Sequence, residues 1–404
     1  MDEIRLPWAD WKIERYLGHG IWGKVYEISR TDPSGTVERA ALKIISIPLY
    51  EYDITFMMEA GADEESIRQY NQEILDNVLR AYSALMQLKG HRGIVRCDAC
   101  ESVPHENGIG WDVFIRMELL TPLISVLNEK TFSEEEILHL GEDLCCALIA
   151  CEEKNFIHHD VKPGNTFLNK NGECKLGDFW IERNKDSTIQ GDYYYMAPEF
   201  CKSQEYGPTA DSYSLGMIMY WLLNNYRRPF IPGDRVPSFQ ERWEANSKRI
   251  NGKEPIPDPV RGNEKLKQVV LKACSYEPEN RFQTAAEFLE ALHSAAEDME
   301  QRNEEKLDED LRCQFCGSRI SEKADYCMVC GTKLMNRNKT GRNGSLDEYG
   351  EVSYKMVYAS PGRETLFPDN RKRYPFNFAE KKREKTARKK SIDSGPFDLF
   401  RRKK

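Results

Sequence analysis

The hydrophobic pattern changes period part-way along the chain, and this change limits the folds open to it. Residues 11–45 alternate apolar and polar positions around glycines, in "WKIERYLGHGIWGKVYEIS" and "ERAALKIISI", which predicts three antiparallel strands joined by tight turns. Residues 64–89 instead carry apolar side chains at intervals of three or four, which predicts one long amphipathic helix. Two more strands are expected at 94–99 and 110–119.

The pattern becomes helical from Ser133 onward. Ser133 is a candidate N-cap residue, and Glu136 three residues later completes the pattern of a capping box. Further helices are expected near residues 208–224, 238–249, 263–275 and 284–298. The sequence therefore predicts an α+β fold with two lobes, a smaller one made mostly of strands and a larger one made mostly of helices.

Composition sets the broad class of protein. The chain has 404 residues, of which 40% are hydrophobic and 31% charged, enough to bury a sizeable core and to form more than one unit. It has no run of about 18 apolar residues, and the start "MDEIRLPWADWKIERY" lacks the basic and apolar regions of a signal peptide. We therefore expect a cytoplasmic protein, whose twelve cysteines are reduced thiols or metal ligands rather than disulfides.

A glycine-rich segment in the strand region indicates phosphate binding. Gly18, Gly20 and Gly23 form "GHGIWGKV", where the missing Cβ atoms would let backbone N–H groups approach a polyphosphate. The dinucleotide-binding fingerprint has the same spacing but opens a helix, whereas this segment continues with strand character. Lys43 follows the last glycine by twenty residues on an apolar strand. Alone it could be a strand-end charge, but together with the loop it predicts a contact to the α and β phosphates of ATP.

A second group of motifs lies after the long helix of the larger lobe. The segment "HHDVKPGN" spans 158–165, and Asp178 of "GDFW" lies thirteen residues after its last asparagine. Because of these motifs, residues 11–298 resemble a bacterial-like member of the eukaryotic-type (Hanks-type) serine/threonine protein kinases. The matching segments follow the family's order: the glycine loop, Lys43, "HRGIV" at 91–95, "MELL" at 117–120, "HHDVKPGN", Asp178, "YMAPE" at 195–199, "DSYSLG" at 211–216, and Arg281 in "PENRF".

The resemblance implies a role for each matching position. Asp160 would accept the proton of the substrate hydroxyl or orient that hydroxyl, and Lys162 would neutralise the transferred phosphoryl group. Asn165 and Asp178 would hold Mg²⁺ or Mn²⁺ through oxygen ligands. Glu199 with Arg281 would form a buried ion pair, and Asp211 would anchor the backbone of the catalytic loop. The positions implied to contact ATP are Gly18, Gly20, Gly23, Val25, Lys43, Met117, Glu118 and Leu120.

One departure from the family pattern concerns the partner of Lys43. The family places a glutamate on the long helix, nine or ten residues before the histidine that corresponds to His91. Counting back reaches Tyr82 and Ala81, and Glu73 lies two helical turns too early. The helix therefore has an unusual register, or Lys43 has lost its anchor.

Three further departures lie around the catalytic motifs. His159 replaces the arginine that commonly receives an activation-loop phosphate, Trp180 replaces the glycine of Asp-Phe-Gly, and Asp192 stands where serine/threonine kinases carry threonine. Two functions stay open. One is an ATP- and magnesium-dependent protein kinase, of low or unusual activity, that phosphorylates Ser or Thr of a protein substrate. The other is an ATP-binding pseudokinase that acts as a scaffold or sensor.

Cysteines cluster after a charged, helical linker expected at 299–312. The segment "CQFCGSRISEKADYCMVCG" contains two CxxC pairs separated by ten residues, a spacing that suits a tetrahedral structural zinc ion and resembles a zinc ribbon at 313–334. By contrast, Cys145, Cys146 and Cys151 on the helix after Ser133 are expected to be small buried hydrophobes. The four predicted zinc ligands are Cys313, Cys316, Cys327 and Cys330.

The tail at 335–404 is polar and expected to be disordered. Its part from Arg371 to Lys404 contains fourteen Lys or Arg and four Asp or Glu, a net charge of about +10 in a chain whose net charge is −8. Such a tail is compatible with binding to nucleic acid or to an anionic membrane, but the favoured interpretation is a solvated segment that binds neither.

Overall fold

The computed structural model describes residues 4–20, 23–49, 51–106, 109–178, 193–202, 206–233, 235–252 and 254–310, and the single positions 312, 318 and 329. The described chain forms two compact units, the first from residues up to 78 and from 99–116, the second from 79–98 and from 117 onward. Among these residues, no helix is both long enough and apolar enough to cross a bilayer. The cysteine cluster at 313–330 and the basic tail lie outside the described residues, apart from those isolated positions.

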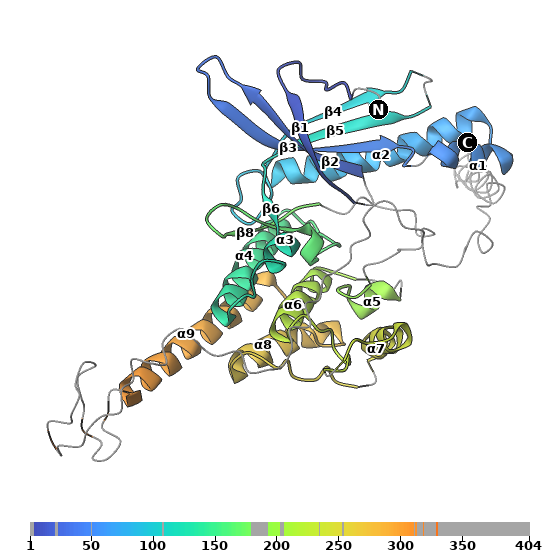
Figure 1. Cartoon of the computed structure of the whole chain (residues 1–404). Coiled ribbons are helices and arrows are strands. Elements are labelled where there is room, and N and C mark those ends of the chain that lie inside the picture. Colours follow the sequence, from blue (N-terminus) through green and yellow to red (C-terminus); the bar gives the residue numbers. More distant parts are fainter. Residues whose placement is uncertain are drawn as a thin grey trace, which may run out of the picture. The chain divides into compact units, whose positions relative to one another are not determined.

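The first unit contains a five-stranded sheet in the order β1-β2-β3-β5-β4 (Figure 1). Strands β1 to β3 pair antiparallel, as the alternating pattern predicts. On one face, Ile28, Leu42 and Phe114 from three strands pack together with Trp11. The strands are β1 (Lys12–Gly20), β2 (Gly23–Thr31), β3 (Val37–Ile47), β4 (Cys97–Pro104) and β5 (Trp111–Met117).

The strand expected at 94–99 is placed differently in the structure. Strand β4 begins at Cys97 and continues to Pro104. The residues before it make other contacts, because the Val95 N–H donates to the carbonyl of Leu176 at 3.0 Å and Ile94 forms an isolated bridge with the same residue.

Two helices lie between β3 and β4 along the chain. Helix α1 (Glu51–Glu59) was not expected, and α2 (Glu64–Gln87) agrees with the predicted long helix. The apolar side chains that set the predicted period are Ile67, Tyr70, Ile74, Val78, Tyr82 and Leu85. Only Ile67 and Val78 of these are buried, and Asn71 and Leu75 complete the buried face of α2. The Nδ2 atom of the buried Asn71 donates to the carbonyl of Ile109 at 2.8 Å.

The second unit is mainly helical. Helix α6 is buried almost throughout its length and packs against α4, α8 and α9, as expected for a helix that is apolar on all sides. The expected helices are confirmed to within a few residues, and α9 continues as one helix through most of the predicted linker. The elements are α3 (Leu123–Leu127), α4 (Glu134–Glu153), η1 (Pro163–Asn165), α5 (Pro198–Cys201), α6 (Thr209–Leu223), α7 (Phe239–Asn251), α8 (Glu264–Ala273), η2 (Pro278–Asn280) and α9 (Ala285–Asp310).

The predicted capping box at the start of α4 is confirmed. The Glu136 N–H donates to Ser133 Oγ at 3.1 Å, and the Ser133 N–H donates to Glu136 Oε2 at 2.9 Å. These two bonds satisfy backbone donors that have no partner inside the helix. Along α4, Cys145 and Cys151 are buried as expected, but Cys146 is exposed, which corrects that prediction. Adjacent helical residues point about 100° apart, so Cys145 and Cys146 cannot both face the core.

A small antiparallel sheet in the second unit positions the "HHDVKPGN" segment and Asp178. It consists of β6 (Thr121–Pro122), β7 (Thr166–Leu168) and β8 (Cys174–Leu176). Thr166 at the start of β7 is opposite Leu176 at the end of β8. The chain just before β7 and the chain just after β8 therefore lie side by side, and these are the segments that carry Asn165 and Asp178.

Candidate active site

Three side chains of the "HHDVKPGN" segment bond to one another. Asn165 Nδ2 donates to Asp160 Oδ2 at 2.7 Å and to the Asp160 carbonyl at 2.9 Å. Lys162 Nζ lies 2.9 Å from the same Oδ2 atom. Two cationic or amide donors thus hold one carboxylate in a fixed orientation, and such charge-assisted bonds are stronger than neutral ones.

Backbone bonds join this segment to the residues that follow β8. The Gly177 N–H donates to the Asn165 carbonyl at 2.9 Å. The Gly177 carbonyl lies 3.1 Å from Nε2 of the buried His158, so Nε2 carries the proton of the neutral ring. Burial lowers the pKa of His158 to about 3, which keeps this ring neutral. Asp178 follows with a φ of 54°, in the left-handed region that aspartate enters more readily than most residues.

Asp211 on α6 fixes the start of the "HHDVKPGN" segment. Its carboxylate accepts the backbone N–H of His158 at 2.6 Å and that of His159 at 2.9 Å. Burial raises the pKa of Asp211 to about 7, while the two N–H donors act in the opposite direction. The loop anchor implied by the family resemblance is therefore present as a pair of hydrogen bonds.

His159 occupies the position where the family commonly carries arginine. Its φ is 65°, and its ring lies near the rings of Phe200 and Tyr206, with centroid separations of 6.2 Å and 5.2 Å. Its Nδ1 atom is buried without a hydrogen-bond partner among the described residues. Burial lowers the pKa of His159 to about 4, so this side chain carries no positive charge near pH 7.

In the first unit, the strand register aligns three of the positions implied to contact ATP. Gly18 in β1 is opposite Val25 in β2, and Val25 is opposite Lys43 in β3. A Cβ atom at Gly18 would meet no atom within 4 Å, and the same holds at Gly20. Gly23 differs, because its φ is 131° and a Cβ would lie 2.0 Å from the Ile44 carbonyl oxygen. A Cβ atom would therefore find open space at Gly18 and Gly20. At Gly23 the positive φ and the nearby Ile44 carbonyl oxygen require a glycine.

The "MELL" segment begins with Met117, the last residue of β5, and belongs to the second unit. The Glu118 N–H donates to the Arg96 carbonyl at 3.0 Å. Glu118 Oε1 accepts from the Arg96 N–H at 2.7 Å and from Lys175 Nζ at 2.7 Å. The Glu118 side chain is thus occupied with structural contacts, while Met117 and Leu120 are half-buried.

The expected ion pair between Glu199 and Arg281 is confirmed. Two guanidinium nitrogens of Arg281 donate to the two Glu199 oxygens at 2.7 Å and 2.8 Å. Sequence reasoning missed Arg249 on α7, which is buried and donates to the carbonyl oxygens of Tyr193 and Met196. No signal in the sequence links Arg249 to those residues, because they lie more than fifty positions away.

Some expectations concern residues outside the described part of the chain. Trp180, Asp192 and the four zinc-ligand candidates Cys313, Cys316, Cys327 and Cys330 all lie there. Within the described part, no cluster of three or more His, Cys, Asp or Glu could hold a metal ion. The loss of an anchor for Lys43 stays a prediction.

The donor set around Asn165 fits a magnesium ion. Its Nδ2 makes both side-chain bonds to Asp160, and no hydrogen bond from the described residues reaches its Oδ1 atom. Asp178 adds a carboxylate on the segment that Gly177 ties to Asn165. An amide oxygen and a carboxylate are the hard ligands that Mg²⁺ prefers.

Comparison with known proteins identifies the family. The model of the protein kinase domain matches residues 11–293, and the chain belongs to this family. It is 33% identical over 158 residues to the serine/threonine-protein kinase PknB of Mycolicibacterium smegmatis, covering 36% of this chain and 24% of that protein. It is 36% identical over 119 residues to the serine/threonine-protein kinase Nek1 of Mus musculus, covering 28% and 9%.

A third relative is named for a different phosphoacceptor. The tyrosine-protein kinase MasK of Myxococcus xanthus is 30% identical over 149 residues, covering 35% of this chain and 22% of that protein. The matches therefore span less than a quarter of the length of each of these three curated relatives.

Proposed function

We propose that this chain is a magnesium-dependent protein kinase that transfers the γ-phosphoryl group of ATP to Ser or Thr of a protein. The observation that carries the proposal is the bonded cluster of Asp160, Lys162 and Asn165, tied through Gly177 to Asp178. Phosphoryl transfer needs positioning and charge neutralisation more than covalent help from the protein. A preorganised carboxylate, ammonium and amide are suited to this task.

Each member of the cluster would have a separate role. Asp160, oriented by Asn165 and Lys162, would accept the proton of the substrate hydroxyl or orient it for attack. Lys162 would neutralise charge on the transferred phosphoryl group. Asn165 and Asp178 would hold the magnesium ion, which supplies charge neutralisation at the phosphates when bound. In the first unit, the row of Gly18, Val25 and Lys43 would bind the nucleotide.

The choice of Ser or Thr as acceptor rests on two of the reported relatives, which are named serine/threonine kinases. Because another relative is named a tyrosine kinase, the amino acid that is phosphorylated has to be measured. Phosphoamino-acid analysis of a labelled protein substrate separates the two classes. Label on Ser or Thr supports the proposal, and label confined to Tyr contradicts this part of it.

The second candidate function is an ATP-binding pseudokinase that acts as a scaffold or sensor. The environment of His159 favours regulation that does not use a phosphate on the activation loop. Its neutral ring lies near the rings of Phe200 and Tyr206 and cannot bind a phosphate as a guanidinium would. This observation concerns switching by activation-loop phosphorylation. It does not remove any group assigned here to phosphoryl transfer.

A transfer assay with paired variants separates the two candidates. We expect the wild type to incorporate labelled phosphate into itself or a protein substrate, and Asp160→Asn to lower the rate by about 10² to 10⁴-fold, the usual contribution of a positioned acid or base. Asp178→Asn should remove the magnesium dependence along with the activity. Incorporation no higher in the wild type than in both variants, while ATP still raises its melting temperature, would contradict the kinase and support the pseudokinase.

For the C-terminal cysteines we propose a structural zinc ion held by two CxxC pairs. Four thiolates leave no open position on a tetrahedral metal, so the zinc would stabilise structure and take no part in transfer. Elemental analysis of the purified chain should give one zinc per chain, and Cys313→Ser with Cys327→Ser should abolish it. The control is Cys146→Ser, since this thiol is exposed on α4; equal zinc loss in the control would refute the assignment.

A further inference from the structure

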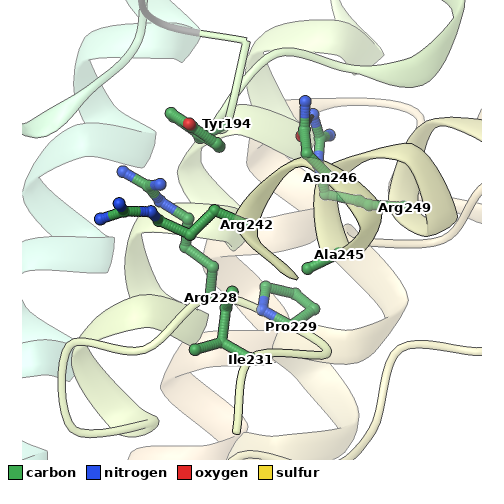
Figure 2. Close-up of a pocket in the computed structure, with 8 residues that line it drawn as sticks. All are labelled: Tyr194, Arg228, Pro229, Ile231, Arg242, Ala245, Asn246 and Arg249. Atoms are coloured by element: carbon green, nitrogen blue, oxygen red, sulfur yellow. Dashed lines mark hydrogen bonds between the residues drawn. The ribbon is translucent and has the colours of Figure 1, made fainter. Parts of the chain in front are cut away.

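A small pocket in the second unit lies where α7 meets the segment before α5 (Figure 2). Tyr194 supplies one wall, and Arg228 and Arg242 supply guanidinium groups that extend to the same side in Figure 2. Arg249 and Ala245 complete the contribution of α7. The catalytic cluster lies elsewhere in the unit, so this pocket is a separate feature from the proposed site of phosphoryl transfer.

The pocket gathers positive charge that described acidic side chains do not neutralise. Among the residues the structure describes, neither Arg228 nor Arg242 forms an ion pair. The guanidinium carbon of Arg228 lies 3.3 Å from the centroid of the Tyr194 ring, a stacked contact that leaves the N–H groups at the edge of the guanidinium plane able to bind an anion. Nearby, Glu241 is already engaged by both terminal nitrogens of Arg235.

Arg249 also lines the pocket and shapes it. It is buried, and its partners are the carbonyls of Tyr193 and Met196, the Asn246 amide oxygen and the Tyr213 hydroxyl. All these partners are neutral. The carbonyl bonds hold the backbone on both sides of Tyr194, so the aromatic wall against which Arg228 stacks has a fixed position.

We infer that Arg228 and Arg242 form a specificity site for an anionic side chain of the protein substrate, either a carboxylate or a phosphate. The inference rests on the proposed function, because it takes residues 193–199 to be part of the surface that binds the substrate. Bidentate guanidinium groups match carboxylate and phosphate geometry. The pocket is too small to enclose a large group, so the anion binds at the guanidinium edges at its mouth.

The test measures peptide binding separately from phosphoryl transfer. Fluorescent peptides carry a central Ser in a neutral sequence, with Glu, Gln or phosphoserine at one flanking position at a time, and their affinities for the full chain are measured by anisotropy. At one flanking position, we expect the Glu or the phosphoserine peptide to bind about tenfold more tightly than the Gln peptide, a difference of about 1.4 kcal/mol. If only the phosphoserine peptide binds more tightly than the Gln peptide, the site selects a previously phosphorylated substrate. If the Glu and phosphoserine peptides both bind more tightly, the site selects an acidic substrate.

Two variants assign the preference to the pocket. Arg242→Gln removes an exposed charge that makes no described side-chain bond, and its combination with Arg228→Gln should bring the affinity ratio close to one. The matched control is Arg235→Gln, whose charge is already neutralised by Glu241; it should keep the wild-type ratio. Melting temperatures measured without peptide show whether the double variant has a folding defect. If it has one, the affinity ratio of the Arg242→Gln variant decides the result.

The outcomes separate this inference from the proposed function. Equal binding of the Glu, Gln and phosphoserine peptides, or a preference that survives both substitutions, overturns the specificity site even if the chain phosphorylates protein. A preference that depends on Arg228 and Arg242 supports the site even if parallel assays with labelled ATP detect no transfer, in which case the kinase function fails and the binding site stands.

Discussion

The ion pair between Arg281 and Glu199 gives a sharp test of how the second unit is held together. The Arg281 side chain is 0% exposed and that of Glu199 is 7% exposed. Besides the two bonds to the carboxylate, Arg281 donates to three carbonyls, those of Ser275 at 2.8 Å, Tyr276 at 2.9 Å and Thr209 at 3.3 Å. Arg281→Met keeps an unbranched side chain but leaves a buried carboxylate without its cation and removes the donor to these three carbonyls.

The expected cost follows from these contacts. Breaking a buried ion pair by removing one partner costs about 3–5 kcal/mol, and we expect the upper half of this range because the three carbonyls also lose their donor. For domains of this size, 1 kcal/mol changes the melting temperature by about 2–4 °C. Arg281→Met should therefore lower the melting temperature of the second unit by about 8–20 °C, measured by thermal unfolding followed by circular dichroism.

A double-mutant cycle tests the physical reason. If the loss arises from an unpaired buried charge, replacing Glu199 by Leu together with Arg281→Met should cost less than the two single changes added together, with a coupling of about 2–3 kcal/mol. Lys248→Met is the control, because its pair with Glu254 is exposed and such pairs contribute about 0–1 kcal/mol. Additive single effects, or a loss for Arg281→Met as small as for Lys248→Met, would refute the reasoning.

Two further predictions concern the anchor and the glycine loop. The folded-state pKa of Asp211, raised by burial from the usual 3.8 to about 7, means that the folded state binds more protons between about pH 4 and 7. The stabilisation from this group is fully present below about pH 4 and is lost as the pH rises through 7, so the stability of the wild type relative to Asp211→Asn should fall over this range; a constant difference would show that Asp211 is ionised throughout. Gly23→Ala should destabilise the first unit by at least 1–3 kcal/mol, since φ is 131° and the added Cβ meets the Ile44 carbonyl. Gly18→Ala, where the Cβ meets open space, should leave the melting temperature without nucleotide nearly unchanged, and equal losses would contradict the steric argument.

Features that depend on neighbouring residues could be predicted from the sequence. The capping box of Ser133 and Glu136 joins residues three positions apart, so both partners are visible in one short segment. The alternation in 11–45 likewise predicts β1 to β3, because a strand exposes successive residues on opposite faces. The cluster of Asp160, Lys162 and Asn165 spans six positions, and its motif places all three groups on one loop.

Features that depend on distant residues could not be predicted in the same way. The exposed face of Cys146 and the buried face of α2 are set by which neighbours the helices pack against, and hydrophobic periodicity alone leaves several rotations open. Helix α1 lies in a segment whose hydrophobic residues follow no clear period. The start of β4 depends on the hydrogen bond between Val95 and Leu176, which lies far away in the sequence. For the start of β4, the contact with Leu176 decided between locally similar alternatives.

The sequence by itself determined the two-part α+β organisation, the family, and the groups that we propose for phosphoryl transfer, because these follow from local periodicity and short motifs. Only the tertiary structure decided that Arg249 holds the segment around Tyr194, and that the anchor expected at Asp211 acts through the N–H groups of His158 and His159. These bonds join positions more than fifty residues apart, and a partner at that distance is selected by packing of the whole unit. The gathering of Arg228 and Arg242 at one pocket has the same origin.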